Sequence, residues 1–378
     1  GAAVSGDVGM TADEPETLRA GARNLEIVAA WLAGAPLPDW SFHELTGFYF
    51  VLDTVRALWI RACAALGLAD AAHAQHLAHL AMAATTLYVL QRLARGVGAS
   101  ERAATLAALA LALLPPFVAH SQSNPKDLPA TFALVLAVAA LLRAARTARW
   151  GDAVLAGVAL GLALTTRIHA LFGIGAAWLF VLATKQRLAR RDFALQAVVV
   201  CVGALAALAF WPWLWPAPAS RFAAAIGGVG TKVFTIPVLY LGDVLPANEV
   251  PWHYRAVLLA ATVPVATTAL AVAGAFALGA RTTADGAPHP AVLGALWLLA
   301  FAMAEGLVWS RYDGVRHFLP ALPGFALLVG TGADWLWTRA RAGPALALAP
   351  FAIAAVELAL VHPYSGAYLN TPVRLALG

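Results

Sequence analysis

The sequence is built from long apolar runs that are separated by short polar segments, and this pattern constrains the fold more than any other feature. The runs are rich in Ala, Leu and Val, and the chain is 61% hydrophobic but only 12% charged. Soluble domains carry about 25% charged residues. A helix of about 20 apolar residues crosses a bilayer, and the runs lack the two-residue alternation of a membrane β-barrel. The sequence therefore predicts an all-α fold, a polytopic membrane helical bundle.

The apolar runs define about ten or eleven membrane spans. Two of them, 153–166 and 168–184, are short for a bilayer about 30 Å thick, and they meet at Thr165, Thr166, Arg167 and His169. Broken helices with polar tips are tolerated where they line a water-filled cavity, so this pair predicts such a cavity at its tip. The ten clearest candidates are 74–91, 103–119, 128–145, 153–166, 168–184, 194–213, 256–280, 290–309, 317–338 and 344–361.

Basic residues cluster in every second loop between these spans. By the positive-inside rule, such loops face the cytoplasm, so the remaining loops, which hold most of the acidic residues, lie on the outer side. The net charge of +5 is explained by these loops, and no nucleic-acid partner is predicted. Cys63 and Cys201 both stand in apolar context, which indicates core residues rather than a disulfide. The basic residues are Arg92, Arg95, Arg102, Arg143, Arg146, Arg149, Lys185, Arg187, Arg190, Arg191, Arg281, Arg339 and Arg341.

Three outer segments are too long to be simple turns. Residues 13–33 have apolar positions at helical spacing, which predicts an amphipathic helix at the membrane interface. Residues 42–66 mix aromatic and charged residues, which fits either an interfacial helix or a tilted span, and 211–232 combines a Trp- and Pro-rich stop with a surface helix. We therefore divide the chain into a first outer loop with interfacial helices, 1–70, and one membrane domain, 71–378.

A polar stretch, HSQSNPKDLPATF at 120–132, lies between two of the most apolar runs. Asp127 and Pro129 suit the first turn of the following helix, where the helix dipole favours a carboxylate, so a capped turn is one explanation. A simple turn does not need His120, Asn124 or Lys126, and their presence favours a functional site.

Two more outer segments concentrate charge. ADEPETLRAGARN places Asp13 and Glu14 before the first interfacial helix, where an acidic residue is also a good cap. SRYDGVRHFLPALPG places five polar residues at the outer mouth of a span, and snorkelling explains only one of its arginines. The five are Arg311, Tyr312, Asp313, Arg316 and His317.

Histidines recur at His73, His76 and His79, loosely on one helical face. Zinc sites use such spacing, but no carboxylate or cysteine lies in register with them. Helix packing at the interface is the alternative explanation, and we predict no metal ligands here.

The outer polar residues suit the chemistry of moving a group away from a phosphate. Arginine and lysine bind phosphate oxygens, and a carboxylate takes the proton from an incoming hydroxyl. The candidate phosphate-binding residues are Lys126, Arg167, Arg311 and Arg316, and the candidate catalytic carboxylates are Asp13, Glu14 and Asp127. Further candidate substrate-binding residues are His120, Asn124, Tyr312, Asp313 and His317.

The chain resembles the GT-C superfamily of membrane glycosyltransferases, and within it the family of protein O-mannosyltransferases and the aminoarabinose transferase of bacteria. The resemblance rests on Asp13-Glu14 before an interfacial helix, Asp127-Leu128-Pro129 between later spans, YDGVRHFLPALP and HPYSGAYLN. Two features differ from the family. The span expected before Asp13 is absent from a chain that begins with Gly, and the usual histidine-proline-proline motif is replaced by SFHELTGF, where only His43 remains.

The resemblance implies a bacterial inner-membrane enzyme whose site faces the periplasm. Its donor would be a polyprenyl-phosphate-linked sugar, a hexose or a pentose, and its acceptor hydroxyl would belong to a lipid, a glycan or a protein, with membrane lipids around the bundle. Asp13 would be the general base, Glu14 its neighbour in the acceptor site and Asp127 a second acidic residue. The resemblance establishes no cofactor and leaves a divalent metal open. A membrane transporter or lipid flippase is the alternative, because broken helices and charge in the membrane also fit transport.

Overall fold

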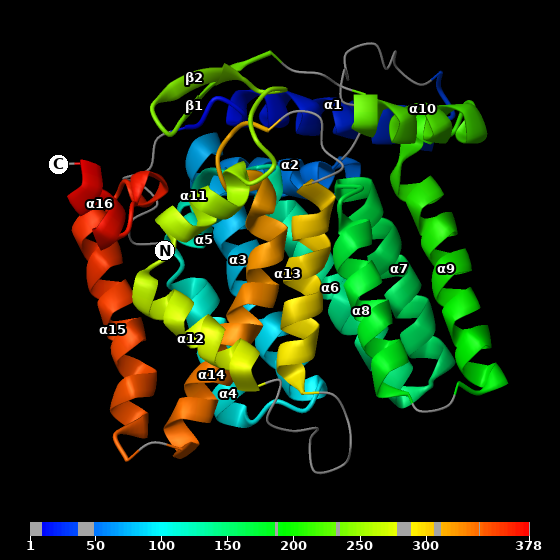
Figure 1. The fold of residues 1–378 in the computed structure, drawn as a ribbon. Helices are drawn as coiled ribbons and strands as arrows, with labels where there is room; N and C mark the ends of the chain where they lie inside the picture. The colour runs from blue at the N-terminus through cyan, green and yellow to red at the C-terminus, as the bar shows by residue number, and fades with distance from the viewer. Residues whose placement is uncertain are drawn as a thin grey trace.

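The computed structural model describes residues 10–36, 49–185, 188–231, 235–277, 289–305, 311–339 and 341–377, and it is an upright bundle of helices (Figure 1). Its described elements are α1 Glu14–Leu32, α2 Phe50–Ala65, α3 Ala71–Gly96, α4 Glu101–Ala112, α5 Pro115–Ser123, α6 Asp127–Thr147, α7 Trp150–Thr166, α8 Ala170–Thr184, α9 Arg190–Phe210, η2 Pro212–Leu214, α10 Pro218–Thr231, β1 Pro237–Tyr240, β2 Asp243–Pro246, α11 Tyr254–Thr262, α12 Val265–Ala277, α13 Pro290–Glu305, η4 Arg316–Ala321, α14 Leu322–Arg339, α15 Gly343–Val361, η5 Ser365–Ala367 and α16 Thr371–Leu377.

The helical membrane fold predicted from the sequence is confirmed, because each of the ten candidate spans overlaps a helix. By length and composition, four of the described helical stretches can cross a membrane, namely α6, α9, η4 with α14, and α15. The number rises to six if each of two bent pairs counts as one span, while α7, α8 and α13 are apolar but shorter. The predicted number of spans stays a prediction.

Prolines account for the two bent pairs. The span predicted at 103–119 bends by 65° between α4 and α5, where Pro115 and Pro116 follow Leu114. The span predicted at 256–280 bends by 114° between α11 and α12, at Pro264. A proline lacks the amide hydrogen that continues a helix, and it disfavours helical conformation in the residue before it. Both bends bring polar helix ends into the upper part of the bundle.

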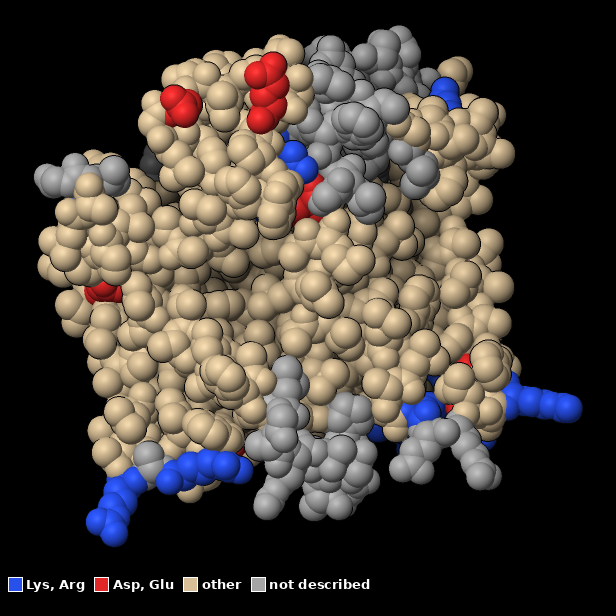
Figure 2. Space-filling view, in the orientation of Figure 1, with Lys and Arg blue, Asp and Glu red and all other residues tan. Residues whose placement is uncertain are grey.

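The described charged residues gather at the two ends of the bundle. In Figure 2 lysines and arginines line the lower rim, acidic and basic residues both lie at the upper face, and the surface between them is almost uncharged. The basic loops that follow α3, α6, α8 and α14 all lie at the lower end in Figure 1. Arg187 and Arg281, also predicted for this side, lie outside the described residues.

The helices α1, α2 and α10 lie across the upper end of the bundle (Figure 1). The inward face of α1 is small and polar, since its buried residues are Glu14, Thr17, Gly21, Asn24 and Ile27. The apolar positions that predicted an amphipathic helix, such as Leu18 and Leu25, are only partly buried. The helix therefore covers a polar region of the bundle rather than an apolar core.

The helix α14 is the centre of the core, and every residue from Leu322 to Ala333 is buried. Glycines let its neighbours approach closely. A Cβ on Gly332 would lie 1.9 Å from the Leu270 carbonyl oxygen of α12, and one on Gly274 would lie 2.1 Å from the Leu328 carbonyl oxygen. Small residues at such crossings are typical of membrane helices, where close packing replaces the hydrophobic effect.

We expect Gly332→Val to force α12 and α14 apart and to lower stability by about 1–3 kcal/mol or more, as overpacking does. The thermal unfolding of the purified protein in detergent measures the change. Gly175→Val in α8 is the matched control, because a Cβ there meets nothing within 4 Å. An equal melting temperature for Gly332→Val and the control would contradict the proposed crossing.

Candidate functional site

Asp13 lies at the upper end of the bundle between two cations from distant parts of the sequence. Its Oδ1 accepts a hydrogen bond of 2.9 Å from Lys126 Nζ, just before α6, and its Oδ2 accepts one of 2.9 Å from Arg316 Nη1, at the start of η4. The carboxylate side chain is 23% exposed. Burial raises the pKa of Asp13, but the contacts with Lys126 and Arg316 bring this pKa below its usual value. Asp13 is therefore ionised at neutral pH.

Asp127 is the second carboxylate of this cluster and is fully buried. It forms an ion pair with Arg167, from the tip between α7 and α8, and its Oδ2 lies 3.5 Å from Arg316 Nε. Arg316 thus bridges Asp13 and Asp127, and it also binds the Asp313 carboxylate at 3.0 Å. The structure brings together three of the four predicted phosphate-binding residues, Lys126, Arg167 and Arg316, around two of the predicted catalytic carboxylates.

Neither carboxylate serves as a helix cap. Asn124 does this work before α6, because its Oδ1 accepts hydrogen bonds from the amides of Lys126 and Asp127 at 2.9 and 2.7 Å. Such Asn turns are common where a helix must begin after a proline-containing loop. Asp13 stands at the N-cap position of α1, but its side chain makes no capping hydrogen bond. Asp127 does stand in the first turn of α6, as the capped-turn explanation predicts, and its contacts with Arg167 and Arg316 go beyond what a cap requires.

Glu14, the third predicted catalytic carboxylate, is turned into the protein. Its carboxylate lies 3.0 Å from His76 Nε2 and accepts a hydrogen bond of 2.6 Å from the Thr11 amide. Burial raises the pKa of Glu14, but the contacts with His76 and Thr11 outweigh burial and bring this pKa below its usual value. This arrangement makes Glu14 an anchor between α1 and α3.

A cavity of about 430 Å³ opens beside Asp13. Thr11, Ala12 and Asp13 form one side, the end of α5 another, and the segment after α15 a third. Two of the predicted substrate-binding residues from α5 and its end line it, His120 and Asn124, whose side chains lie 3.2 Å apart. The described residues that line the cavity are Thr11, Ala12, Asp13, Ala119, His120, Gln122, Ser123, Asn124, Pro125, Asp313, Arg316, Pro363, Ser365 and Gly366.

Arg311 and His317 belong to a second polar cluster. Arg311 donates hydrogen bonds to the backbone oxygens of Glu305, at 2.6 Å, and Val250, at 3.1 Å. Arg255 forms an ion pair with Glu305 and lies 3.1 Å from His317 Nδ1. The structure places Arg311 against Glu305 rather than against Asp13 or Asp127. The predicted Tyr312 packs edge-to-face on His317, with 5.1 Å between the ring centroids.

The sequence analysis missed Arg255 and Glu305, although a signal was present. Both residues stand at the ends of apolar helices, α11 and α13, and both are buried. Ionisable residues in such positions are costly and usually have a partner. A search for two opposite charges in neighbouring spans would have found this pair.

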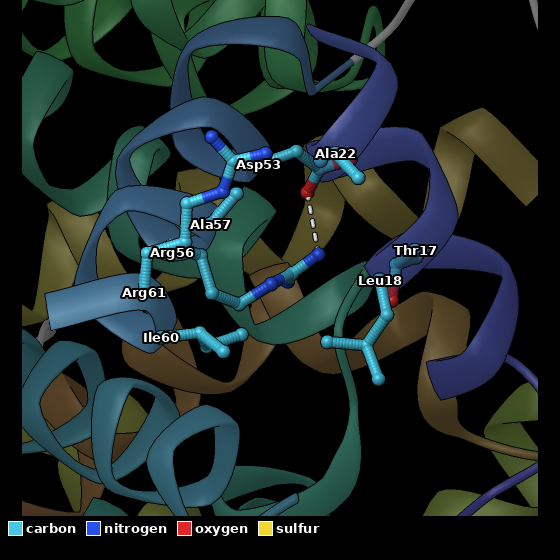
Figure 3. Close-up of a pocket in the computed structure, with 9 residues that line it drawn as sticks. Thr17, Leu18, Ala22, Asp53, Arg56, Ala57, Ile60 and Arg61 are labelled. Atoms are coloured by element: carbon cyan, nitrogen blue, oxygen red, sulfur yellow. Dashed lines mark hydrogen bonds and ion pairs between the residues drawn. The ribbon is translucent and has the colours of Figure 1, made fainter. Parts of the chain in front are cut away.

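A third buried ion pair supports the site from α2. Asp53 and Arg56 line a small cavity next to α1 (Figure 3), and its volume is about 100 Å³. Burial raises the pKa of Asp53 to about 6 despite the neighbouring Arg56. Arg56 also lies 3.4 Å from His79 Nε2 and from the Pro125 carbonyl oxygen. These contacts fix the loop that carries Lys126.

Two histidines of α3 also contact residues of the site. His79 Nδ1 lies 3.1 Å from the Gln122 carbonyl oxygen, and His76 binds Glu14. Within the described ranges of the chain, no group of three or more His, Cys, Asp or Glu side chains is arranged to hold a metal ion. His43 lies outside the described residues.

A known protein family matches part of the sequence. Residues 55–215 match the family model of dolichyl-phosphate-mannose-protein mannosyltransferase, a stretch that contains Lys126, Asp127 and Arg167 but not Asp13 or Arg316. None of the curated proteins matches the sequence significantly.

Solved membrane proteins share the fold. The apo structure of ArnT from Cupriavidus metallidurans is 18% identical, with a TM-score of 0.60 over 92% of this chain and 60% of ArnT. The same protein bound to undecaprenyl phosphate is 19% identical, with a TM-score of 0.60 over 91% of this chain and 60% of ArnT. The archaeal oligosaccharyltransferase AglB from Archaeoglobus fulgidus, in complex with an inhibitory peptide and a dolichol-phosphate, is 14% identical, with a TM-score of 0.51 over 83% of this chain and 46% of AglB.

The chain has the GT-C fold, and the resemblance predicted from the sequence is confirmed at this level. It spans about 60% of the length of the ArnT structures that it matches.

We expect Asp127→Ala to destabilise the protein by about 3–5 kcal/mol, because removing one partner of a buried ion pair leaves the other charge unpaired. Unfolding in mixed detergent micelles measures the difference. Asp152→Ala is the matched control, since Asp152 pairs with the exposed Arg143 at the opposite end of the bundle, and we expect a smaller loss there. An equal loss in both variants would contradict the central role of Asp127.

Proposed function

We propose that the chain is a glycosyltransferase that moves a sugar from a polyprenyl-phosphate donor to an acceptor hydroxyl, with Asp13 as the general base. The observation that carries the proposal is the position of Asp13, an ionised carboxylate that lines a cavity of about 430 Å³ and touches two cations. A base for this chemistry must reach the acceptor hydroxyl while cations stand next to it for the leaving phosphate.

The charges of the site favour a phosphate. Lys126, Arg167 and Arg316 stand next to Asp13 and Asp127, and Lys126 and Arg316 have further, more exposed carboxylate partners in Glu16 and Asp313. A phosphate can replace these exposed partners, and at the edge of an apolar bundle the cations attract it more strongly than they would in water. Arg316 has a planar guanidinium that suits phosphate oxygens.

The reaction balances with these groups alone. The acceptor oxygen forms a bond to the anomeric carbon, the bond from that carbon to the phosphate oxygen breaks, and the acceptor proton passes to Asp13. The polyprenyl phosphate leaves as an anion and keeps the electron pair of the broken bond. Lys126 and Arg316 stabilise the charge that develops on this phosphate.

Donor binding also prepares the base in this scheme. Two cations on one carboxylate make Asp13 a weak base, and burial acts in the opposite direction. A phosphate that draws Lys126 or Arg316 towards itself raises the pKa of Asp13. The base therefore gains strength when the donor is in place.

The comparisons support the substrate class and the location. One of the structures with the same fold is ArnT bound to undecaprenyl phosphate, and the matching family model is that of dolichyl-phosphate-mannose-protein mannosyltransferase. The positive-inside rule assigns the basic loops at the lower end of the bundle to the cytoplasm, and this supports a periplasmic position for Asp13 in a bacterial inner membrane. A hexose and a pentose both remain within this proposal, and the acceptor is a lipid, a glycan or a protein.

We expect Asp13→Asn to reduce sugar transfer by about 10²–10⁴-fold, the usual contribution of a general base. Membranes that contain the chain are supplied with undecaprenyl-phosphate-linked radiolabelled mannose, and release of undecaprenyl phosphate is measured. Asp192→Asn is the matched control, because Asp192 pairs with Lys185 at the opposite end of the bundle. Near-normal release by Asp13→Asn would reject its role, and translocation of an intact donor would favour a transporter.

We expect Lys126→Met to move the acidic limb of the activity profile towards higher pH. Asp13 works as a base only when it is ionised. Burial raises the pKa of Asp13, and the hydrogen bond and charge of Lys126 are the largest of the effects that bring it below its usual value. Removing Lys126 raises this pKa, so activity is lost at a higher pH as the solution is acidified. The profile of kcat/KM against pH measures the shift, with Lys185→Met as the control. An unmoved acidic limb would show that Asp13 does not set it.

A further inference from the structure

The segment between α15 and α16 closes one side of the cavity beside Asp13. Pro363, Ser365 and Gly366 line it together with Asp13 and residues of α5. We call Pro363–Gly366 the late wall. It comes from HPYSGAYLN, a motif that the reaction proposed above does not use.

Hydrogen bonds of the residues that follow the late wall hold it in position. Tyr368 is 1% exposed and its hydroxyl donates a hydrogen bond of 2.7 Å to Glu357 in α15. Asn370 donates hydrogen bonds of 2.6 and 3.0 Å to the carbonyl oxygens of Ala260 and Val263, next to the bend between α11 and α12. A wall held in this way limits the size of what enters the cavity.

The lining of the cavity is polar, but its charges are already matched. Asp13 binds Lys126 and Arg316, and Asp313 binds Arg316. Among the described residues that line the cavity, no carboxylate is left without a cation. An ammonium group would lose its water there without gaining a carboxylate partner, which is unfavourable.

Uncharged hydrogen-bonding groups are present as well. Gln122 and Asn124 bring amide-bearing side chains to the lining of the cavity, and Ser123 brings a hydroxyl-bearing one. Amides and hydroxyls both donate and accept hydrogen bonds, as sugar hydroxyls do. His120 and Ser365 offer further contacts of this kind.

The geometry points to a sugar subsite: we propose that this cavity takes one neutral monosaccharide of the donor and that the late wall sets its size. The proposal rests on the glycosyl transfer proposed above. A volume of about 430 Å³ lies near the lower end of ligand pockets, about 300–1,000 Å³. It suits one sugar ring beside an acceptor hydroxyl and is small for an oligosaccharide.

Gly366 offers a direct test of the late wall. A Cβ at this position would meet only the Cβ of Ala119, at 3.6 Å, which is ordinary contact. Alanine therefore fits, and Gly366 is exposed at the edge of the cavity, where the longer side chain of leucine adds bulk. Gly366→Leu should reduce the room for the sugar without touching the cations.

The experiment measures the binding of three lipids to the purified full chain by isothermal titration calorimetry. The lipids are a short polyprenyl phosphate, its mannose derivative and its 4-amino-4-deoxyarabinose derivative. We expect the wild-type chain to bind the mannose derivative about tenfold more tightly than the amino sugar, or ~1.4 kcal/mol. Gly366→Leu should lose about tenfold in affinity for the mannose derivative and keep its affinity for polyprenyl phosphate. Gly366→Ala and Gly151→Leu are the controls, because a Cβ at residue 151 meets nothing within 4 Å.

The outcomes separate this inference from the proposed function. Tighter binding of the amino sugar would overturn the neutral-sugar assignment, and unchanged mannose affinity in Gly366→Leu would overturn the late wall, while the transfer reaction would stand. If the wild-type chain binds none of the three lipids, the proposed function fails and the inference fails with it. If Gly366→Leu lowers the affinity for polyprenyl phosphate as much as the affinity for the mannose derivative, the substitution does not act on the sugar alone. This outcome also counts against the inference.

Discussion

The ion pairs of Arg316 hold the upper end of this bundle together. One guanidinium contacts Asp13 before α1, Asp127 at the start of α6 and Asp313 before η4. These three carboxylates are far apart in the sequence, so the contacts fix the first outer segment, the middle spans and the late spans relative to one another. Charges at the edge of an apolar bundle interact more strongly than in water, so these ion pairs hold the three segments together more firmly than pairs in water would.

Much of the fold and part of the site follow from the sequence, for a simple reason. A bilayer excludes unpaired polar groups from its core, so polar stretches between apolar runs must lie at one end or the other. Positive charge then identifies the ends. This reasoning placed His120, Asn124, Lys126 and Asp127 with Arg167 and Arg316 on one side, and the described helices bring these residues together.

Pairing within that end could not be predicted. Arg311 and Arg316 are five residues apart, yet one binds at Glu305 and the other at Asp13 and Asp127, because the turn at Asp313 and Gly314 sends them in different directions. Both residues of this turn have positive φ. The inward polar face of α1 could not be predicted either. The spacing of apolar residues shows which side of a helix avoids water, but it does not show which side packs on charged residues of another helix. Partner choice depends on helix rotation, for which these segments carry no periodic signal.

The same cations serve the fold and the proposed chemistry. Three cations lie among four carboxylates, and two of these carboxylates, Glu16 and Asp313, are the most exposed members of the cluster. Exposed ion pairs contribute little to stability, so in the proposed reaction a phosphate can take their place at Lys126 and Arg316 at little cost. The fully buried Asp127 keeps its contacts in this exchange, and the helices stay in place while the cations change partners.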